Sequence, residues 1–167
     1  MNRRRGSANR TRRLLRRGVT VEAMALLTLG TALQRWVPMP RWSRLLGRPG
    51  SVPEGWANTR QRALPQRAAT PVERRVALAV RAGGRRLPWN PTCLAEAIAG
   101  QTLLRQFGQP GVVVIGLRAT DEGPWDAHAW LLGRRGALTG GPAAQGFTAT
   151  TVFEVPTGPT ARELVAT

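Results

Sequence analysis

Apolar positions in the first third of the chain recur at helical spacing. Between residues 20 and 37 they return every three or four positions, which predicts a helix that is apolar over much of its surface. The segment VPMP ends this helix, and the next short helical segment, RWSRLLGRPG, is predicted to end at Gly47 with Pro49 just beyond it. We expect the two helices to cover the core; the alternative is that they lie on a membrane surface.

A capped helix is predicted after a linker at residues 50–70, where Pro and Gly interrupt any regular pattern. Thr70 is expected to be the N-cap of this helix, with Glu73 three positions later, which is the spacing of a capping box. The helix should run to about residue 82, because a Gly-Gly pair follows and stops it. The front half of the chain is therefore predicted to be helical.

Beyond Pro110 the spacing changes to that of strands. The first candidate is a continuous β-branched run, typical of a strand buried on both faces. In the second, His128 and Trp130 should point to one face and the residues between them to the other. Helices followed by an antiparallel sheet indicate an α+β fold. The strand candidates are GVVVIGLRA, AHAWLLG, ALTGGP and FTATTVFEV, at residues 111–119, 127–133, 137–142 and 147–155.

The 167 residues are enough for one domain with a substantial core, and a second full domain is not expected. Composition shifts and linker signals divide the chain into four parts. They are an Arg-rich mobile arm at 1–17, a helical region with its linker at 18–66, a core at 67–155 and a tail at 156–167.

The chain is strongly basic, with 25 basic residues, all of them arginine, against 9 acidic ones and a net charge of +16. Eight of the arginines lie within residues 1–17, so acidic surfaces, nucleic acid or anionic lipid could attract this segment. No nucleic-acid reading motif or aromatic platform follows, and we expect no specific nucleic-acid partner. Peripheral contact with a membrane remains compatible with this charge.

The apolar stretch from Met24 to Leu33 is too short to span a bilayer. Glu22 interrupts its entry, and no cleavage site of a signal peptide follows it. We therefore expect a cytoplasmic protein.

One cysteine and one histidine limit the chemistry. An internal disulfide and a zinc site are both excluded by these numbers, and neither a metal nor a cofactor is expected. The pair is the minimum set for a thiol nucleophile and its base. Thr92 is a plausible N-cap that places Cys93 at the first position of a helix ending near Gly108, where free N–H groups favour a thiolate. The alternative is that Cys93 is a buried structural residue and His128 an ordinary core or surface histidine.

The local sequences LPWNPTCLAEAIAGQTLLRQFGQPGVVVIGL and DAHAWLLGRRG are informative together. Pro88-Trp89 precedes Thr92-Cys93-Leu94, and Ala127-His128-Ala129-Trp130 follows a strand. With RLLGRP at residues 44–49, this combination closely resembles the B2 leader peptidases of lasso peptide biosynthesis, which belong to the transglutaminase-like cysteine protease superfamily. The resemblance extends over roughly residues 15–155.

The resemblance implies a papain-like core, in which a helix carrying Cys93 packs on an antiparallel sheet carrying His128. Cys93 would attack the carbonyl at the leader–core junction, and His128 would act as base and then as acid. The family completes this pair with an Asp on the next strand, where this chain has Thr139, Gly140 and Gly141. Asp126, a backbone carbonyl or the Thr139 hydroxyl could orient the imidazole instead. Trp89 and Trp130 are candidates for cleft walls, and core packing is the alternative for each.

The implied activity is removal of the leader from a ribosomally made lasso precursor in a bacterium. The implied partners are the precursor itself, a separately encoded leader-recognition protein and an ATP-dependent, asparagine-synthetase-like cyclase that closes the macrolactam. Two alternatives stay open. The chain could be a non-catalytic scaffold that presents the precursor, or an acyl transferase that uses an amine in place of water.

Overall fold

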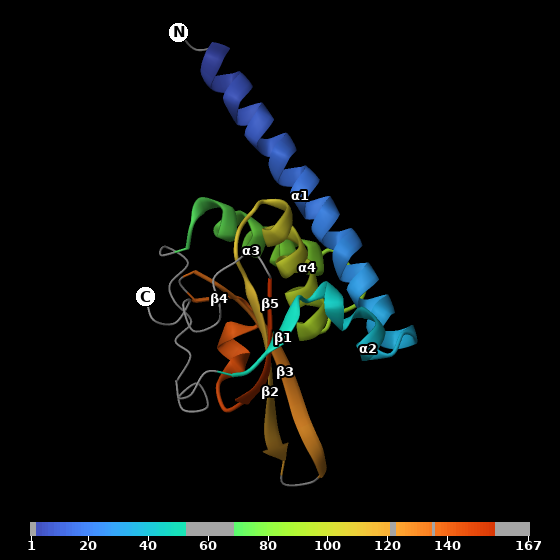
Figure 1. Ribbon diagram of the computed structural model, residues 1–167. Coiled ribbons are helices and arrows are strands. Elements are labelled where there is room, and N and C mark those ends of the chain that lie inside the picture. Colours follow the sequence, from blue (N-terminus) through green and yellow to red (C-terminus); the bar gives the residue numbers. More distant parts are fainter. Residues whose placement is uncertain (1–2, 53–68, 121–122, 135, 156–167) are drawn as a thin grey trace.

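The computed structural model describes residues 3–52, 69–120, 123–134 and 136–155, and for 3–16 it describes the backbone alone. Helices come first along the chain and most of the strands follow, as the sequence predicts (Figure 1). The elements are α1 (Arg3–Trp36), α2 (Met39–Trp42), η1 (Ser43–Leu45), β1 (Arg48–Gly50), α3 (Pro71–Gly84), α4 (Cys93–Gln106), β2 (Val112–Thr120), β3 (Gly123–Gly133), β4 (Gly136–Thr139), η2 (Gly141–Ala144) and β5 (Thr148–Glu154).

Helix α1 begins at Arg3, well before the apolar pattern that predicts a helix from residue 20. Arginine and leucine have high helix propensity, which favours a helical backbone in the Arg-rich segment. Figure 1 shows this first part of α1 extending away from the other elements. The backbone of residues 3–17 of the predicted arm is thus helical, while the mobility of the arm stays a prediction.

The second predicted helix ends as expected, and a strand that was not predicted follows it. Residues 39–45 are helical, as α2 and η1, but Gly47 then adopts a φ of 124° and turns the chain into β1. A strand was not predicted here because proline is depleted in strands; Pro49 is tolerated because β1 lies at the edge of the sheet. Most of the predicted linker at 50–70 lies outside the described residues.

The five strands form one antiparallel sheet in the order β1-β5-β2-β3-β4. Helices α1, α3 and α4 pack together on one face of the sheet and share the larger apolar cluster with it. On the opposite face a smaller cluster surrounds Trp130 and includes Ala144 of η2. The α+β architecture is confirmed, and it places α4 directly against β3.

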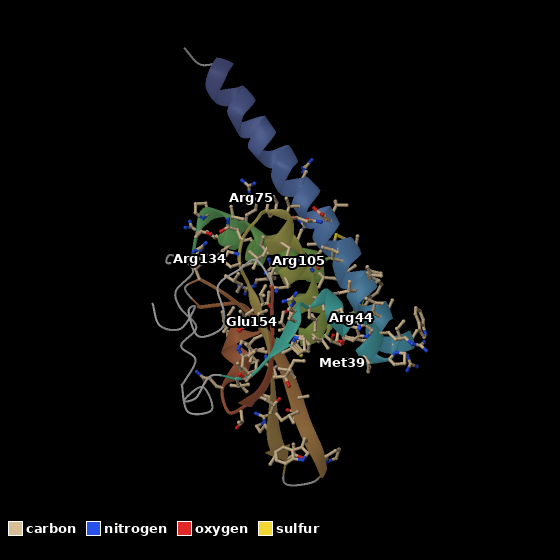
Figure 2. All side chains as sticks on the ribbon, in the orientation of Figure 1. Met39, Arg44, Arg75, Arg105, Arg134 and Glu154 are labelled. Atoms are coloured by element: carbon tan, nitrogen blue, oxygen red, sulfur yellow. The ribbon has the colours of Figure 1, made fainter. Side chains whose placement is uncertain are left out.

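A glutamate joins the start of α3 to the turn between β3 and β4. Glu73 is fully buried, and the predicted capping box is present: the Thr70 N–H donates to Glu73 Oε2 at 2.7 Å. The other carboxylate oxygen, Oε1, accepts from the N–H of Arg134 at 2.7 Å. Figure 2 shows Arg75 of α3 and Arg134 on the same side of the molecule. One side chain therefore satisfies donors of both elements.

Replacing Glu73 by alanine should lower the free energy of unfolding by about 3 kcal/mol, because two main-chain N–H groups lose a charged acceptor. Urea unfolding of the variant and the parent measures this difference. Glu22→Ala is the matched control; Glu22 lies half-buried on α1, away from this turn, and a change below about 0.5 kcal/mol is expected there. Equal losses in the two variants would contradict the joining role of Glu73.

Candidate active site

Cys93 is the first residue of α4, as the N-cap pattern predicts. The Thr92 hydroxyl oxygen accepts from the Ala95 N–H at 3.1 Å, which closes the first turn of the helix. The same hydroxyl donates to Gln34 Oε1 of α1 at 2.8 Å, and Gln34 Nε2 donates to the Gly30 carbonyl at 2.9 Å. The end of α1 therefore holds the N-cap next to the cysteine, a contact that no local sequence signal predicts.

Strand β3 brings His128 to the cysteine. The half-buried Sγ of Cys93 accepts a hydrogen bond from the main-chain N–H of Ala129 at 3.4 Å, and His128 is the residue before Ala129. The structure thus places the sulfur of Cys93 beside the residue that follows His128, although 35 positions separate Cys93 and His128 along the chain.

Aromatic rings flank the His128 imidazole. The ring of Trp130, two residues along the strand, stacks with it at a centroid distance of 6.0 Å, which confirms that the two share a face. The ring of Phe147 lies 5.2 Å away. Trp130 is only 1% exposed and belongs to the core cluster, so packing is its main role, whereas Trp89 is 42% exposed.

A main-chain carbonyl lies where the resemblance implies a carboxylate. His128 Nε2 lies 2.8 Å from the carbonyl oxygen of Gly140, just past the end of β4. A carbonyl oxygen only accepts hydrogen bonds, so Nε2 carries the proton and Nδ1 is left free to act as a base. The partner therefore comes from the predicted segment 139–141, through its backbone.

The two side-chain alternatives do not bond to the imidazole. Asp126 forms an ion pair with Arg118 at 2.7 Å. The Thr139 hydroxyl is buried, and it has no hydrogen-bond partner among the described residues.

Gly140 can hold this position only as glycine. Its φ of 69° lies in the left-handed region, which side chains disfavour. A Cβ atom there would also lie 2.6 Å from the Ala129 carbonyl oxygen and 3.2 Å from His128 Nε2. The close approach of the Gly140 backbone to the imidazole thus requires the absence of a side chain.

A carboxyl group lies one helical turn after Cys93. Burial raises the pKa of the Glu96 carboxyl, and the charges of His128 and Arg81 oppose this effect only in part. The sequence places Glu96 in the first turn of α4 but gives no sign that it interacts electrostatically with His128.

The free energy of unfolding of Glu96→Gln, relative to that of the parent, should increase as pH rises. Because the carboxyl has a raised pKa when folded, its contribution to stability is fully present below the unfolded-state pKa and is lost as pH rises through the folded-state pKa. Urea unfolding of both proteins across this pH range measures the change. The difference at the lowest pH, where both side chains are neutral, serves as the packing reference. A difference that stays constant or falls with pH would contradict the expectation.

Among the described residues, no group of three or more histidine, cysteine or carboxylate side chains could hold a metal ion. In the same part of the chain, no helix has both the length and the apolar character needed to cross a membrane.

A known protein family matches most of the chain. The family model described as transglutaminase-like superfamily matches residues 33–152, from the last turn of α1 into β5. Both Cys93 and His128 lie within this match. Searches of curated proteins and of solved structures gave no significant match.

Proposed function

Because the chain belongs to the transglutaminase-like superfamily, we propose that it is a cysteine peptidase that removes the leader of a lasso precursor peptide. The superfamily contains cysteine peptidases and acyltransferases, and its members are typically catalytic cysteine enzymes. The finer assignment is supported by the likeness of the Cys93 and His128 segments to those of the B2 leader peptidases.

One observation carries the proposal. Cys93 Sγ lies at the N-terminal end of α4 and accepts from the N–H of Ala129, next to a histidine whose Nε2 is already engaged. The free N–H groups at a helix start stabilise a thiolate there, and the unprotonated Nδ1 can take the thiol proton. A purely structural cysteine would need neither the helix start nor the oriented imidazole.

The reaction follows from these positions. Nδ1 of His128 accepts the thiol proton, and the Cys93 thiolate attacks the carbonyl carbon at the leader–core junction. The main-chain N–H of Cys93 stabilises the resulting oxyanion. The C–N bond then breaks, and the amine of the core peptide leaves with the proton from Nδ1. Water, deprotonated by the same nitrogen, hydrolyses the thioester and releases the leader as a free carboxylate.

The partners follow from this product. The core peptide leaves with a new N-terminal amine, which a separate ATP-dependent, asparagine-synthetase-like cyclase joins to an acidic side chain. A separately encoded protein recognises the leader, and the reaction takes place in the cytoplasm. Thiol, imidazole and water suffice for the chemistry, so the peptidase uses no cofactor.

The proposal is tested by searching the neighbouring reading frames for a short precursor gene and incubating the encoded peptide with the protein in isotopically labelled water. The recognition protein is present in one series and absent in another. Mass spectrometry should show a single cut, with the label in the new carboxylate of the leader. The test is repeated with methylamine added.

Each outcome assigns a function. A leader amide formed with methylamine in place of the labelled acid would indicate an acyl transferase. Binding of the precursor without any cut, with or without the recognition protein, would overturn the peptidase and indicate a presenting scaffold.

A further inference from the structure

Part of β3 has a neighbouring strand on one side only. Strand β4 pairs with residues 131–133 of β3 and no further, because the chain turns away at Gly140 into η2. The earlier residues of β3 pair with β2 on one side. Among the residues that the structure describes, none pairs with them on the other. Figure 1 shows the β2–β3 hairpin extending beyond the rest of the sheet.

The direction of the main-chain groups follows from the bond to the cysteine. Ala129 donates its N–H to Cys93, so the N–H and C=O of Ala129 point away from β2. Ile115 is the partner of Ala129 on β2, and the carbonyl of Ile115 accepts from the Thr150 hydroxyl of β5. The main-chain groups of Ile115 therefore point away from β3, which is consistent with those of Ala129 pointing away from β2. Strand geometry repeats every second residue, so the N–H and C=O of Ala127 also point away from β2. No described residue bonds to them.

We propose that the precursor peptide binds as an added antiparallel strand on this edge of β3, with one residue exchanging both main-chain hydrogen bonds with Ala127. The proposal rests on the peptidase function and names how its substrate is held. An extended peptide is the occupant that fits, because the free groups are main-chain donors and acceptors at strand spacing. The strand also leads directly to Cys93 Sγ at Ala129.

The topology sets the direction of the bound peptide. Every pairing in the sheet is antiparallel, and the substrate strand would continue this pattern. It would then run from Ala129 towards Ala127, about 7 Å along the edge, so the residue opposite Ala127 lies two positions after the one opposite Ala129. Beyond Ala129 in the other direction β4 occupies the edge. The main chain of β3 thus binds the core peptide, on the C-terminal side of the cut. The leader, on the N-terminal side, points away from the sheet.

The side chains of Ala127 and Ala129 on this edge give little selectivity for the sequence of the bound peptide. Ala127 and Ala129 carry only methyl groups, and Asp126 and Arg118 neutralise each other in an ion pair. Main-chain pairing gives affinity without strong sequence preference, whereas specificity needs side-chain pockets. A peptidase that binds its substrate in this way depends on another protein to select the leader.

Backbone methylation of the substrate tests the added strand directly. Synthetic peptides spanning the junction carry one N-methyl group each, at successive positions on both sides of the cut. Methylation of the residue opposite Ala127, on the core side, should lower kcat/KM about tenfold. Methylation of the next residue along, and of leader positions away from the scissile bond, should change kcat/KM less than twofold.

The outcomes separate this proposal from the peptidase function. If the unmethylated parent peptide is not cut, the peptidase function fails. The added strand is wrong if the parent is cut and methylation on the core side, at every position away from the scissile bond, leaves kcat/KM unchanged. It is also wrong if the parent is cut and only methylation on the leader side lowers kcat/KM.

A variant of the protein gives an independent test. Ala127→Pro removes the outward N–H from the edge without breaking the pairing to β2, and it should raise KM about tenfold. Ala119→Pro is the matched control. Ala119 is exposed near the end of β2 in the same hairpin, at a register shift where no described residue of β3 or β5 is paired with it. Its KM should stay within twofold of the parent.

The rate at which iodoacetamide alkylates Cys93 shows whether the site is intact in each variant, and it should be unchanged in both. If Ala127→Pro and Ala119→Pro changed KM by the same factor, the proposal would be overturned. A loss of dimer, seen by light scattering, that accompanies the Ala127→Pro change would also overturn it, because the edge would then serve a second copy of the chain.

Discussion

Cleavage of the precursor is expected to fall at least 10⁴-fold when Cys93 is replaced by alanine, because no other thiol is present to form the acyl intermediate. His128→Ala should have a loss of similar size, since the residues of a nucleophile–base pair act as a unit. Product formation over time, followed by mass spectrometry, measures both.

The fold should survive the cysteine change. Cys93 contributes one weak hydrogen bond, to Ala129, and its side chain is only half-buried. The far-ultraviolet circular dichroism spectrum and the midpoint of thermal unfolding of Cys93→Ala should therefore match the parent closely. A variant that folds and still cuts the precursor at more than about a hundredth of the parent rate would exclude a thiol mechanism.

The second large effect is expected at Gly140. In Gly140→Ala the new Cβ would press against the Ala129 carbonyl oxygen and His128 Nε2, so the backbone must shift and the carbonyl loses its hold on the imidazole. Gly140 acts through His128 as a positioning residue, and loss of such a partner costs about 10–100-fold in activity. Strain in the left-handed region adds about 1–3 kcal/mol of destabilisation.

Gly108→Ala is the matched control, because it separates the strain from the loss of position. Gly108 has nearly the same φ, 62°, and a Cβ there would meet no atom within 4 Å. It should lose stability through the backbone alone and keep its kcat. The pH profile of kcat/KM should change in Gly140→Ala and not in Gly108→Ala. Equal kcat values in the two variants, at equal temperature relative to their melting points, would refute the positioning role.

Local patterns in the sequence predicted the elements that carry the candidate site. The N-cap at Thr92 identified Cys93 as the first residue of a helix, and the structure places it there. Alternation in AHAWLLG put His128 and Trp130 on one face, which their stacked rings confirm. These predictions succeed because caps and strand alternation depend on residues a few positions apart.

Other parts were missed because their causes are not local. The Arg-rich segment continues α1, and β1 forms just after the predicted end of the second helix, because pairing with β5 decides its conformation. Glu73 was expected to cap α3, and its second bond, to Arg134, spans 61 residues. The pairing of Gln34 with Thr92 likewise joins α1 to α4.

By itself, the sequence of this protein determined which residues can do chemistry: one thiol, one imidazole, and the helix start and strand that carry them. For the orienting partner of His128 it left Asp126, a backbone carbonyl and the Thr139 hydroxyl open. Only the tertiary structure decided that this partner is the Gly140 carbonyl and that the Ala129 N–H meets the sulfur. The physical reason is that main-chain donors and acceptors are the same in nearly every residue. Which of them lies at the site depends on where β4 ends beside β3, and the packing of the whole sheet sets that point.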